Sequence, residues 1–112
     1  MIKVKVEEYQ SKITTFRISG HANTAEHGED LVCAAVSGIV QAALYGLMEY
    51  LKIEMKWTNQ EGLVEVELLT EPTLETEAIL RSMLLGLKGI ELECPKALKI
   101  DKIKNINGRR KK

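Results

Sequence analysis

Aromatic residues are scarce in this chain. Its 112 residues include one Trp, one Phe and three Tyr, so that only 4% of the side chains are aromatic. A chain of this length is typically one domain, and it buries enough surface for a core without disulfides or metal ions. Because large rings are so few, we expect the core to consist of Leu, Ile, Val and Ala side chains.

The chain also lacks a long uninterrupted apolar run. No stretch reaches the roughly 18 consecutive apolar residues of a membrane span. The first ten residues alternate charged and apolar side chains, unlike the apolar centre of a secretion signal. We therefore expect no membrane contact and a cytoplasmic protein. In that reducing compartment Cys33 and Cys94 would stay thiols, and a disulfide between them is the less favoured alternative.

The chain as a whole has no excess of either charge, but its parts do. Its 16 basic and 16 acidic side chains cancel. Four of the basic ones close the chain at 109–112, which leaves the rest with an acidic excess of about four. Such a body is not the basic surface of a nucleic-acid-binding domain. We predict one domain at 1–104 and a disordered basic tail at 105–112, through which alone nucleic acid would be contacted.

The hydrophobic pattern predicts an α+β protein with the element order ββαββαβ. Apolar and polar residues alternate in the expected strands, and the expected helices carry apolar stripes. Hairpin connections favour an antiparallel sheet of four to five strands with both helices on one face. The expected strands are 2–8, 13–19, 55–58, 63–69 and 97–103, and the expected helices are 31–53 and 73–92.

Small residues recur every four positions along the first expected helix, at Ala34, Gly38, Ala42 and Gly46. Such a stripe lets another helix approach closely. Close packing would compensate the roughly 1 kcal/mol that each interior glycine costs relative to alanine. The partner is either the second helix or the same helix of another subunit.

Groups able to do chemistry near neutral pH are concentrated between residues 20 and 37. This stretch reads GHANTAEHGEDLVCAAVS and contains both histidines, His21 and His27, together with Cys33. His21 follows the end of a strand, whereas His27 lies in the middle of a loop. We expect His21 and Cys33 to form a thiol–imidazole pair where the strand, the loop and the helix meet.

Cys33 lies near the expected helix start. With Asp30 as the N-cap it would be the third helical residue, where the helix dipole favours the thiolate that acts as nucleophile. The N–H groups of that turn could also bind an oxyanion. Asp30 has an alternative role in orienting the histidine, and Ser37 shares the polar face one turn later. Gly20 and Gly28 are the expected hinges of the loop.

Spacing alone leaves other roles open for these residues. A cysteine outside a disulfide is most often a small buried hydrophobic residue, and spacing alone favours that role for Cys33. A metal site built from His21, His27, Cys33 and an acid is a further alternative. Its spacings match no compact ligand motif, and we expect neither a metal nor a cofactor. Cys94 has no histidine beside it and is expected to be structural.

The stretch from residue 20 to 37 resembles the signature of the ribosomal-processing cysteine protease (Prp) family. That signature has GHA at a strand end, a Gly and an Asp before V-C-A, and a Ser four residues after the Cys. The resemblance extends over about residues 1–104. The matching residues are Gly20, His21, Ala22, Gly28, Asp30, Val32, Cys33, Ala34 and Ser37.

The resemblance implies a cysteine endopeptidase that removes a short N-terminal extension from a large-subunit ribosomal protein during ribosome assembly. It implies Cys33 as nucleophile and His21 as base, with Asp30 and Ser37 near the active site. It also implies cleavage after an aromatic residue, a loop that orders on substrate binding, and a homodimer. The alternative is a non-catalytic ribosome-assembly or RNA-binding factor that acts through the basic tail.

Overall fold

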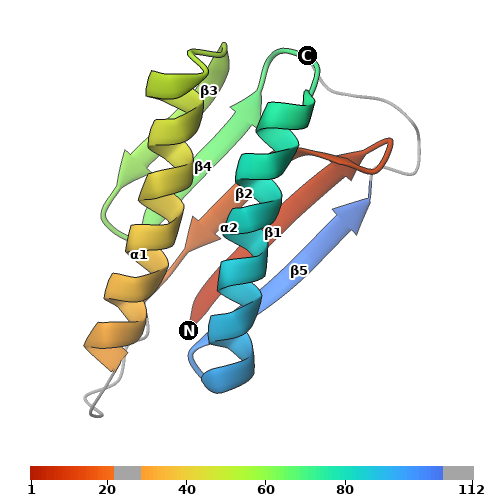
Figure 1. The fold of residues 1–112 in the computed structure, drawn as a ribbon. Coiled ribbons are helices and arrows are strands. Elements are labelled where there is room, and N and C mark those ends of the chain that lie inside the picture. The colour runs from red at the N-terminus through yellow and green to blue at the C-terminus, as the bar shows by residue number, and fades with distance from the viewer. Residues whose placement is uncertain (22–28, 105–112) are drawn as a thin grey trace.

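The computed structural model describes residues 1–21 and 29–104, which form two layers (Figure 1). A five-stranded sheet is the first layer, and two antiparallel helices across one of its faces are the second. The predicted α+β class and the order ββαββαβ are confirmed. The strands are β1 (Ile2–Tyr9), β2 (Lys12–Ser19), β3 (Met55–Gln60), β4 (Leu63–Leu68) and β5 (Leu98–Lys104), and the helical segments are α1 (Glu29–Tyr45), η1 (Gly46–Tyr50) and α2 (Leu74–Glu93).

The sheet is mixed, although most of its pairings are antiparallel as predicted. The strand order is β3-β4-β2-β1-β5. The pairs β1–β2, β2–β4 and β3–β4 are antiparallel, whereas β5 runs parallel to β1 with Leu98 opposite Ile2. The exception follows from the connection, because α2 carries the chain across the sheet and returns it in the direction of β4. A crossover of this kind joins parallel strands.

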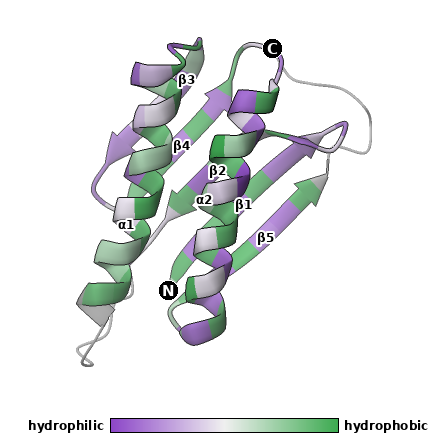
Figure 2. Ribbon diagram, viewed as in Figure 1, coloured by the Kyte–Doolittle hydropathy of each residue, from purple (hydrophilic) through white to green (hydrophobic). Residues whose placement is uncertain are grey.

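The core is aliphatic, as the scarcity of aromatic residues predicts. Val4, Val6, Leu44 and Leu80 are each 0% exposed. Phe16 is the one ring in the core of the described chain. Figure 2 shows the source of this burial, since apolar and polar residues alternate along the strands and the apolar stripes of the helices meet the sheet.

The turn between β1 and β2 is tighter than predicted. Only Gln10 and Ser11 separate the strands, and both have positive φ, 52° and 66°. Non-glycine residues adopt this conformation at a cost, so surrounding contacts must hold it. A register shift beside Glu7 and Glu8 brings both Ile13 and Phe16 into the core, although strict alternation would put them on opposite faces of the strand.

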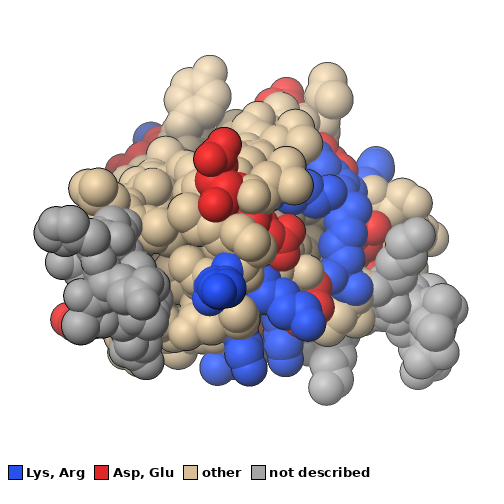
Figure 3. All heavy atoms as spheres, turned by 90° about the horizontal axis from the view of Figure 1, so that it is seen from below, with Lys and Arg blue, Asp and Glu red and all other residues tan. Residues whose placement is uncertain are grey.

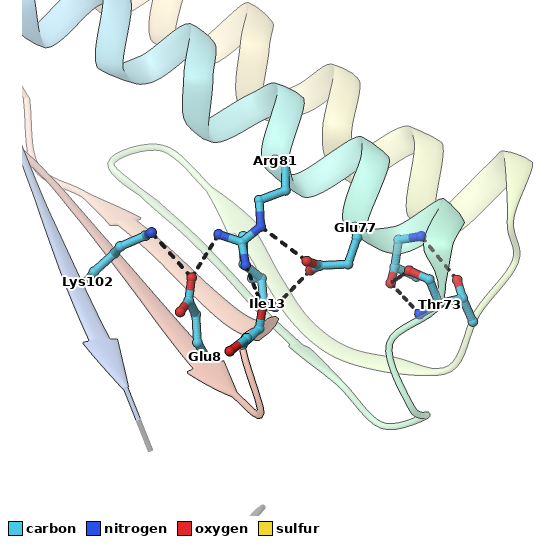
Figure 4. Close-up of polar contacts among 8 residues, drawn as sticks. Glu8, Ile13, Thr73, Glu77, Arg81 and Lys102 are labelled. Carbon is cyan, nitrogen blue, oxygen red and sulfur yellow. Dashed lines mark hydrogen bonds and ion pairs between the residues drawn. The ribbon is translucent and has the colours of Figure 1, made fainter. Parts of the chain in front are cut away.

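An ionic network holds this turn against α2 (Figure 4). Arg81 of α2 donates to the Glu8 carboxylate at 2.8 Å and to the Glu77 carboxylate at 3.1 Å. A third bond runs from Arg81 to the Ser11 carbonyl oxygen at 2.9 Å. Lys102 of β5 approaches Glu8 at 3.4 Å. One guanidinium therefore joins the end of β1, the strained turn and the start of α2.

The Glu8 carboxylate stays ionised because of these cations. Burial by itself raises the pKa of Glu8, whose exposure is 5%. The hydrogen bond and charge of Arg81, together with Lys102, outweigh burial and hold the pKa below its ordinary value. A folded pKa below the unfolded one means that ionised Glu8 stabilises the fold above the unfolded pKa, about 4.3. This contribution is lost as the pH falls through the lower folded pKa.

We therefore predict that Glu8→Gln lowers the free energy of unfolding at pH 7 by about 1.5–3 kcal/mol. The gap to the wild type should narrow as the pH falls below about 4.3, which urea denaturation at pH 7 and pH 3 measures. Glu65→Gln is the control, because its partner Arg17 and Glu65 itself are well exposed, and it should cost less than about 1 kcal/mol. A gap independent of pH would contradict the account.

The first helix ends earlier than predicted. α1 stops at Tyr45, and the π-helical turn η1 follows, with the Leu51 N–H donating to the Gly46 oxygen at 2.9 Å. Lys52 then adopts a left-handed φ of 53°, which ends the helical course. Leu51 and Ile53 still pack against the core. Their apolar character continued the helical pattern in the sequence and extended the predicted helix too far.

The stripe of small residues meets α2 at one point and is open at another. A Cβ atom on Gly46 would lie 3.2 Å from the Ile79 side chain of α2. In return, a Cβ atom on Gly86 of α2 would lie 3.2 Å from Ile39. Nothing lies within 4 Å of such an atom on Gly38. Of the two partners that the sequence left open, the second helix is the one at Gly46, and it does not cover Gly38.

By length and composition alone, Leu31–Tyr50 is apolar enough to cross a membrane, although the absence of a long uninterrupted apolar run predicted no such span. In the fold this segment lies on the sheet, and 33% of it is buried. The core helix of a globular protein passes the same test, so one helix of this kind is weak evidence for a membrane span.

Candidate active site

Two glycines meet at the end of the sheet where β2 ends and β4 begins. Ser19 and Leu63 are paired in register, and beyond them the Gly20 N–H donates to the Gly62 oxygen at 3.0 Å. Both glycines have positive φ, 94° and 80°. Glycine adopts this conformation without steric cost. The chain therefore leaves β2 directly beside the turn that joins β3 and β4.

The His21 imidazole packs against this turn. A Cβ atom on Gly62 would lie 2.8 Å from His21 Nε2 and 3.3 Å from Cε1, so the ring rests where another residue would have a side chain. The His21 carbonyl oxygen accepts from the Met1 amino group at 2.8 Å. The backbone and the ring of His21 are therefore both positioned, although the residue is exposed.

A cavity of about 490 Å³ lies between α1 and the β3–β4 hairpin. His21, Cys33, Ser37 and Gly20 line it, so the structure brings together four of the predicted site residues. Cys33 is half-buried in its wall and does not share a disulfide with Cys94. The apolar residues that line the cavity are Ile2, Ile18, Val36, Val40, Leu63 and Val64.

The position of Cys33 in the helix differs from the prediction. α1 begins at Glu29, so Asp30 is its second residue and not its N-cap. Cys33 is then the fifth helical residue, and its N–H belongs to the internal hydrogen-bond ladder of the helix. Carboxylates are favoured in the first turn as well as at the cap, so the acidic pair Glu29 and Asp30 does not identify the cap. The predicted oxyanion site of first-turn N–H groups therefore excludes the Cys33 amide.

Part of the predicted site lies outside the described residues. This applies to Gly28, to His27 and to the side chain of Asp30, so the proposed hinge and the role of the aspartate stay predictions. Among the described side chains, no three of the types His, Cys, Asp and Glu gather closely enough to hold a metal ion.

Gly62 and Asn59 were not among the site residues expected from the sequence, because they lie between or at the end of expected strands and carry no motif. Gly62 supports His21, and Asn59 lines the cavity. A glycine in a hairpin turn signals a positive φ, but no local pattern shows that a distant imidazole rests on it. These two positions are apparent only once β4 is paired with β2.

A thiol, an imidazole and a hydroxyl that line one partly apolar cavity are the groups of nucleophilic catalysis. An imidazole can take the proton of a thiol, which makes the sulfur a nucleophile toward carbonyl carbon. The cavity also provides apolar surface for a substrate side chain. This arrangement points to acyl transfer through a cysteine, and comparison with known proteins tests that interpretation.

A family model described as cysteine protease Prp matches residues 1–99. The chain belongs to this family. The match includes β1, the residue pair His21 and Cys33, both helices and the start of β5. Membership confirms the resemblance that the stretch from residue 20 to 37 carries.

Individual relatives agree with this assignment. The ribosomal processing cysteine protease Prp of Bacillus subtilis is 47% identical over 45 residues, which are 39% of this chain and 40% of that protein. The protein of the same name from Mycoplasma pneumoniae is 37% identical over 79 residues, 70% of this chain and 63% of its own length. The matched region thus spans less than two thirds of either relative.

Solved structures share the fold. The Prp protease of Staphylococcus aureus, crystallised with a covalently linked product peptide, superposes with a TM-score of 0.81 at 24% identity and covers 91% of this chain and 99% of its own. The crystal structure of SMU.848 from Streptococcus mutans superposes with a TM-score of 0.74 at 20% identity, over 94% of this chain and 96% of its own.

The contact between the His21 ring and Gly62 predicts the effect of a side chain at position 62. Gly62→Ala should destabilise the fold by about 1–2 kcal/mol because of its left-handed φ, and it should shift the NMR signals of the His21 ring, which the new methyl group contacts. Gly89→Ala is the control: Gly89 lies inside α2 in open space, and alanine there should stabilise by about 0.5–1 kcal/mol. Unchanged NMR signals of His21 in Gly62→Ala would contradict the packing of the His21 ring against Gly62.

Proposed function

We propose that this chain is a cysteine endopeptidase that removes a short N-terminal extension from a large-subunit ribosomal protein in the cytoplasm during ribosome assembly. The observation that carries the proposal is the placement of His21 and Cys33 on one cavity in a chain of the Prp family. The names of the relatives support the ribosomal substrate. The aliphatic lining of the cavity supports an aromatic residue before the cleaved bond.

In the first half of the reaction, His21 accepts the thiol proton of Cys33, and the sulfur attacks the carbonyl carbon of the scissile peptide bond. The tetrahedral intermediate collapses when the carbon–nitrogen bond breaks. The departing amine takes the proton from His21, and the acyl group stays on sulfur as a thioester. In the second half, water gives a proton to His21 and attacks the thioester. The acid product leaves, and the proton returns to the thiol.

Two further groups support this chemistry. Ser37 lies one turn after Cys33 on the cavity wall, where its hydroxyl can donate to the oxyanion that forms in each half of the reaction. Asp30 lies in the first turn of α1, and the resemblance to the family supports a role for its charge beside His21. We assign Ser37 to the substrate and Asp30 to the histidine.

The proposal includes a homodimer. The outward part of the small-residue stripe is exposed at Ala34, Gly38 and Ala42, and Leu31 beside it is 74% exposed. An exposed stripe of small and apolar residues suits the close approach of a second copy of α1. Gly38→Leu should therefore raise the monomer fraction in sedimentation velocity, and a wild type that sediments as a monomer would overturn the dimer.

The charges of the chain bear on the alternative of an RNA-binding factor. In Figure 3, Lys and Arg gather over part of the end of the molecule that is seen from below, with Asp and Glu among them. Without the four basic residues at 109–112, however, the chain has an acidic excess of about four, which does not favour nucleic acid. The alternative of a non-catalytic RNA-binding factor rests on the basic tail at 105–112. Deleting 108–112 should abolish RNA association if that alternative holds, and should leave cleavage intact if the peptidase proposal holds.

The direct test incubates the purified protein with its ribosomal protein in extended form and follows the mass of the substrate. Cys33→Ala and His21→Ala should abolish processing, since each removes a group that moves the proton or attacks the carbonyl. Cys94→Ser is the matched control, because Cys94 ends α2 and does not line the cavity, and it should process like the wild type.

Processing by Cys33→Ala at the wild-type rate would overturn the peptidase assignment. Loss of processing in Cys94→Ser but not in Cys33→Ala would move the nucleophile away from the cavity and would contradict the proposed mechanism.

A further inference from the structure

The two walls of the cavity are joined by a pair of amide side chains. Gln41 of α1 donates from Nε2 to Asn59 Oδ1 at 2.8 Å, and Asn59 of β3 donates from Nδ2 to Gln41 Oε1 at 3.0 Å. Both residues line the cavity together with Cys33. The pair therefore bridges the helix that carries the nucleophile and the hairpin that supports His21.

The paired amides keep hydrogen-bonding capacity for a ligand. Each primary amide has two N–H donors and two acceptor lone pairs on oxygen. The reciprocal bonds use one donor and one acceptor on each side chain. What is left on each of the two, an N–H and a lone pair, is the same set of groups that a peptide unit presents to a neighbouring strand. The pair can therefore bind the backbone of an extended peptide.

The fold does not need this pair for its stability. Both side chains are solvent-accessible at the cavity, where a hydrogen bond replaces one to water and contributes little net free energy. The core beneath them is formed by other residues, with Val40 at 1% exposure and Val64 at 8%. Gln41 and Asn59 are thus polar groups held at a cleft without a structural requirement for their polarity.

The distance from the nucleophile fixes which part of a substrate the pair would meet. Gln41 lies eight residues after Cys33 in α1, which at 1.5 Å per residue is about 12 Å along the helix. An extended peptide advances about 3.3 Å per residue. A peptide that lies along α1 from Cys33 therefore reaches the pair after about three to four residues.

We propose that Gln41 and Asn59 form a substrate-binding subsite for the peptide backbone, three to four residues from the cleaved bond. This inference rests on the proposed peptidase function, since it takes Cys33 as the point where the peptide is cleaved. The subsite makes substrate length a determinant of cleavage. It selects an extended segment on one side of the scissile bond instead of a particular side chain.

The test uses synthetic peptides from the N-terminal extension of the ribosomal protein, shortened one residue at a time from each end. For the wild type, kcat/KM should fall roughly tenfold when the third or fourth residue on one side is removed, which corresponds to the loss of one or two hydrogen bonds. In the double variant Gln41→Ala/Asn59→Ala, this tenfold fall in kcat/KM should be absent, and the difference from the wild type should lie mainly in KM. Lys56→Ala, on β3 outside the cavity, is the control and should keep the step.

The same step in the wild type and in the double variant would overturn the subsite. A second measurement separates the subsite from the peptidase: the affinity of the same peptides for Cys33→Ala, with and without the two amide substitutions, measured by fluorescence anisotropy. If the wild type cleaves the peptides, but the dependence of kcat/KM on peptide length is the same with and without the two amide substitutions, the subsite alone is overturned. Affinity that depends on length and on the pair, without wild-type cleavage, supports the subsite and overturns the peptidase. Absence of both binding and cleavage overturns both.

Discussion

The candidate site depends on one backbone hydrogen bond, from the Gly20 N–H to the Gly62 oxygen at 3.0 Å. This bond continues the pairing of β2 and β4 past the end of the sheet and sets the β3–β4 turn beside the residue that follows Gly20. His21 therefore has its ring over a glycine that has no side chain to displace it. Both glycines adopt positive φ, so side chains at either position would disturb the bond, the ring or both. The position of the imidazole is thus a consequence of how β2 leaves the sheet.

The opposite end of the sheet supplies the rigidity that this arrangement requires. There the Arg81 guanidinium joins Glu8, Glu77 and the strained turn at Ser11. The network fixes α2 on the sheet. Gly46 of η1, which directly continues α1, leaves room for Ile79 of α2, because a Cβ atom on Gly46 would lie 3.2 Å from the Ile79 side chain. The proposed catalytic pair, if held on rigid elements, would keep its geometry without reorganisation at the moment of reaction. The ionic network and the strained turn thus lie at one end of the sheet, and the cavity with the candidate site lies at the other end.

The sequence predicted the fold class, the element order and the cavity residues His21, Cys33 and Ser37, because periodicity and the motif are local signals. It did not predict the parallel pairing of β5, which depends on where a crossover returns the chain, nor the helix start at Glu29, since acidic residues are favoured both at the cap and in the first turn. The role of Gly62 depends on a contact across about 40 residues of chain, which no local pattern encodes.

Cys33, and not Cys94, is the proposed nucleophile of the cavity. A peptide vinyl sulfone that carries an aromatic residue next to its reactive group tests this claim directly, because such a compound forms a stable bond with an activated thiol. Peptide mapping by mass spectrometry after brief exposure should find the adduct on Cys33 alone in the folded wild type, a strongly reduced adduct in His21→Ala, and modification of both cysteines after unfolding. Equal modification of Cys33 and Cys94 in the folded protein, or an adduct unaffected by His21→Ala, would contradict the account.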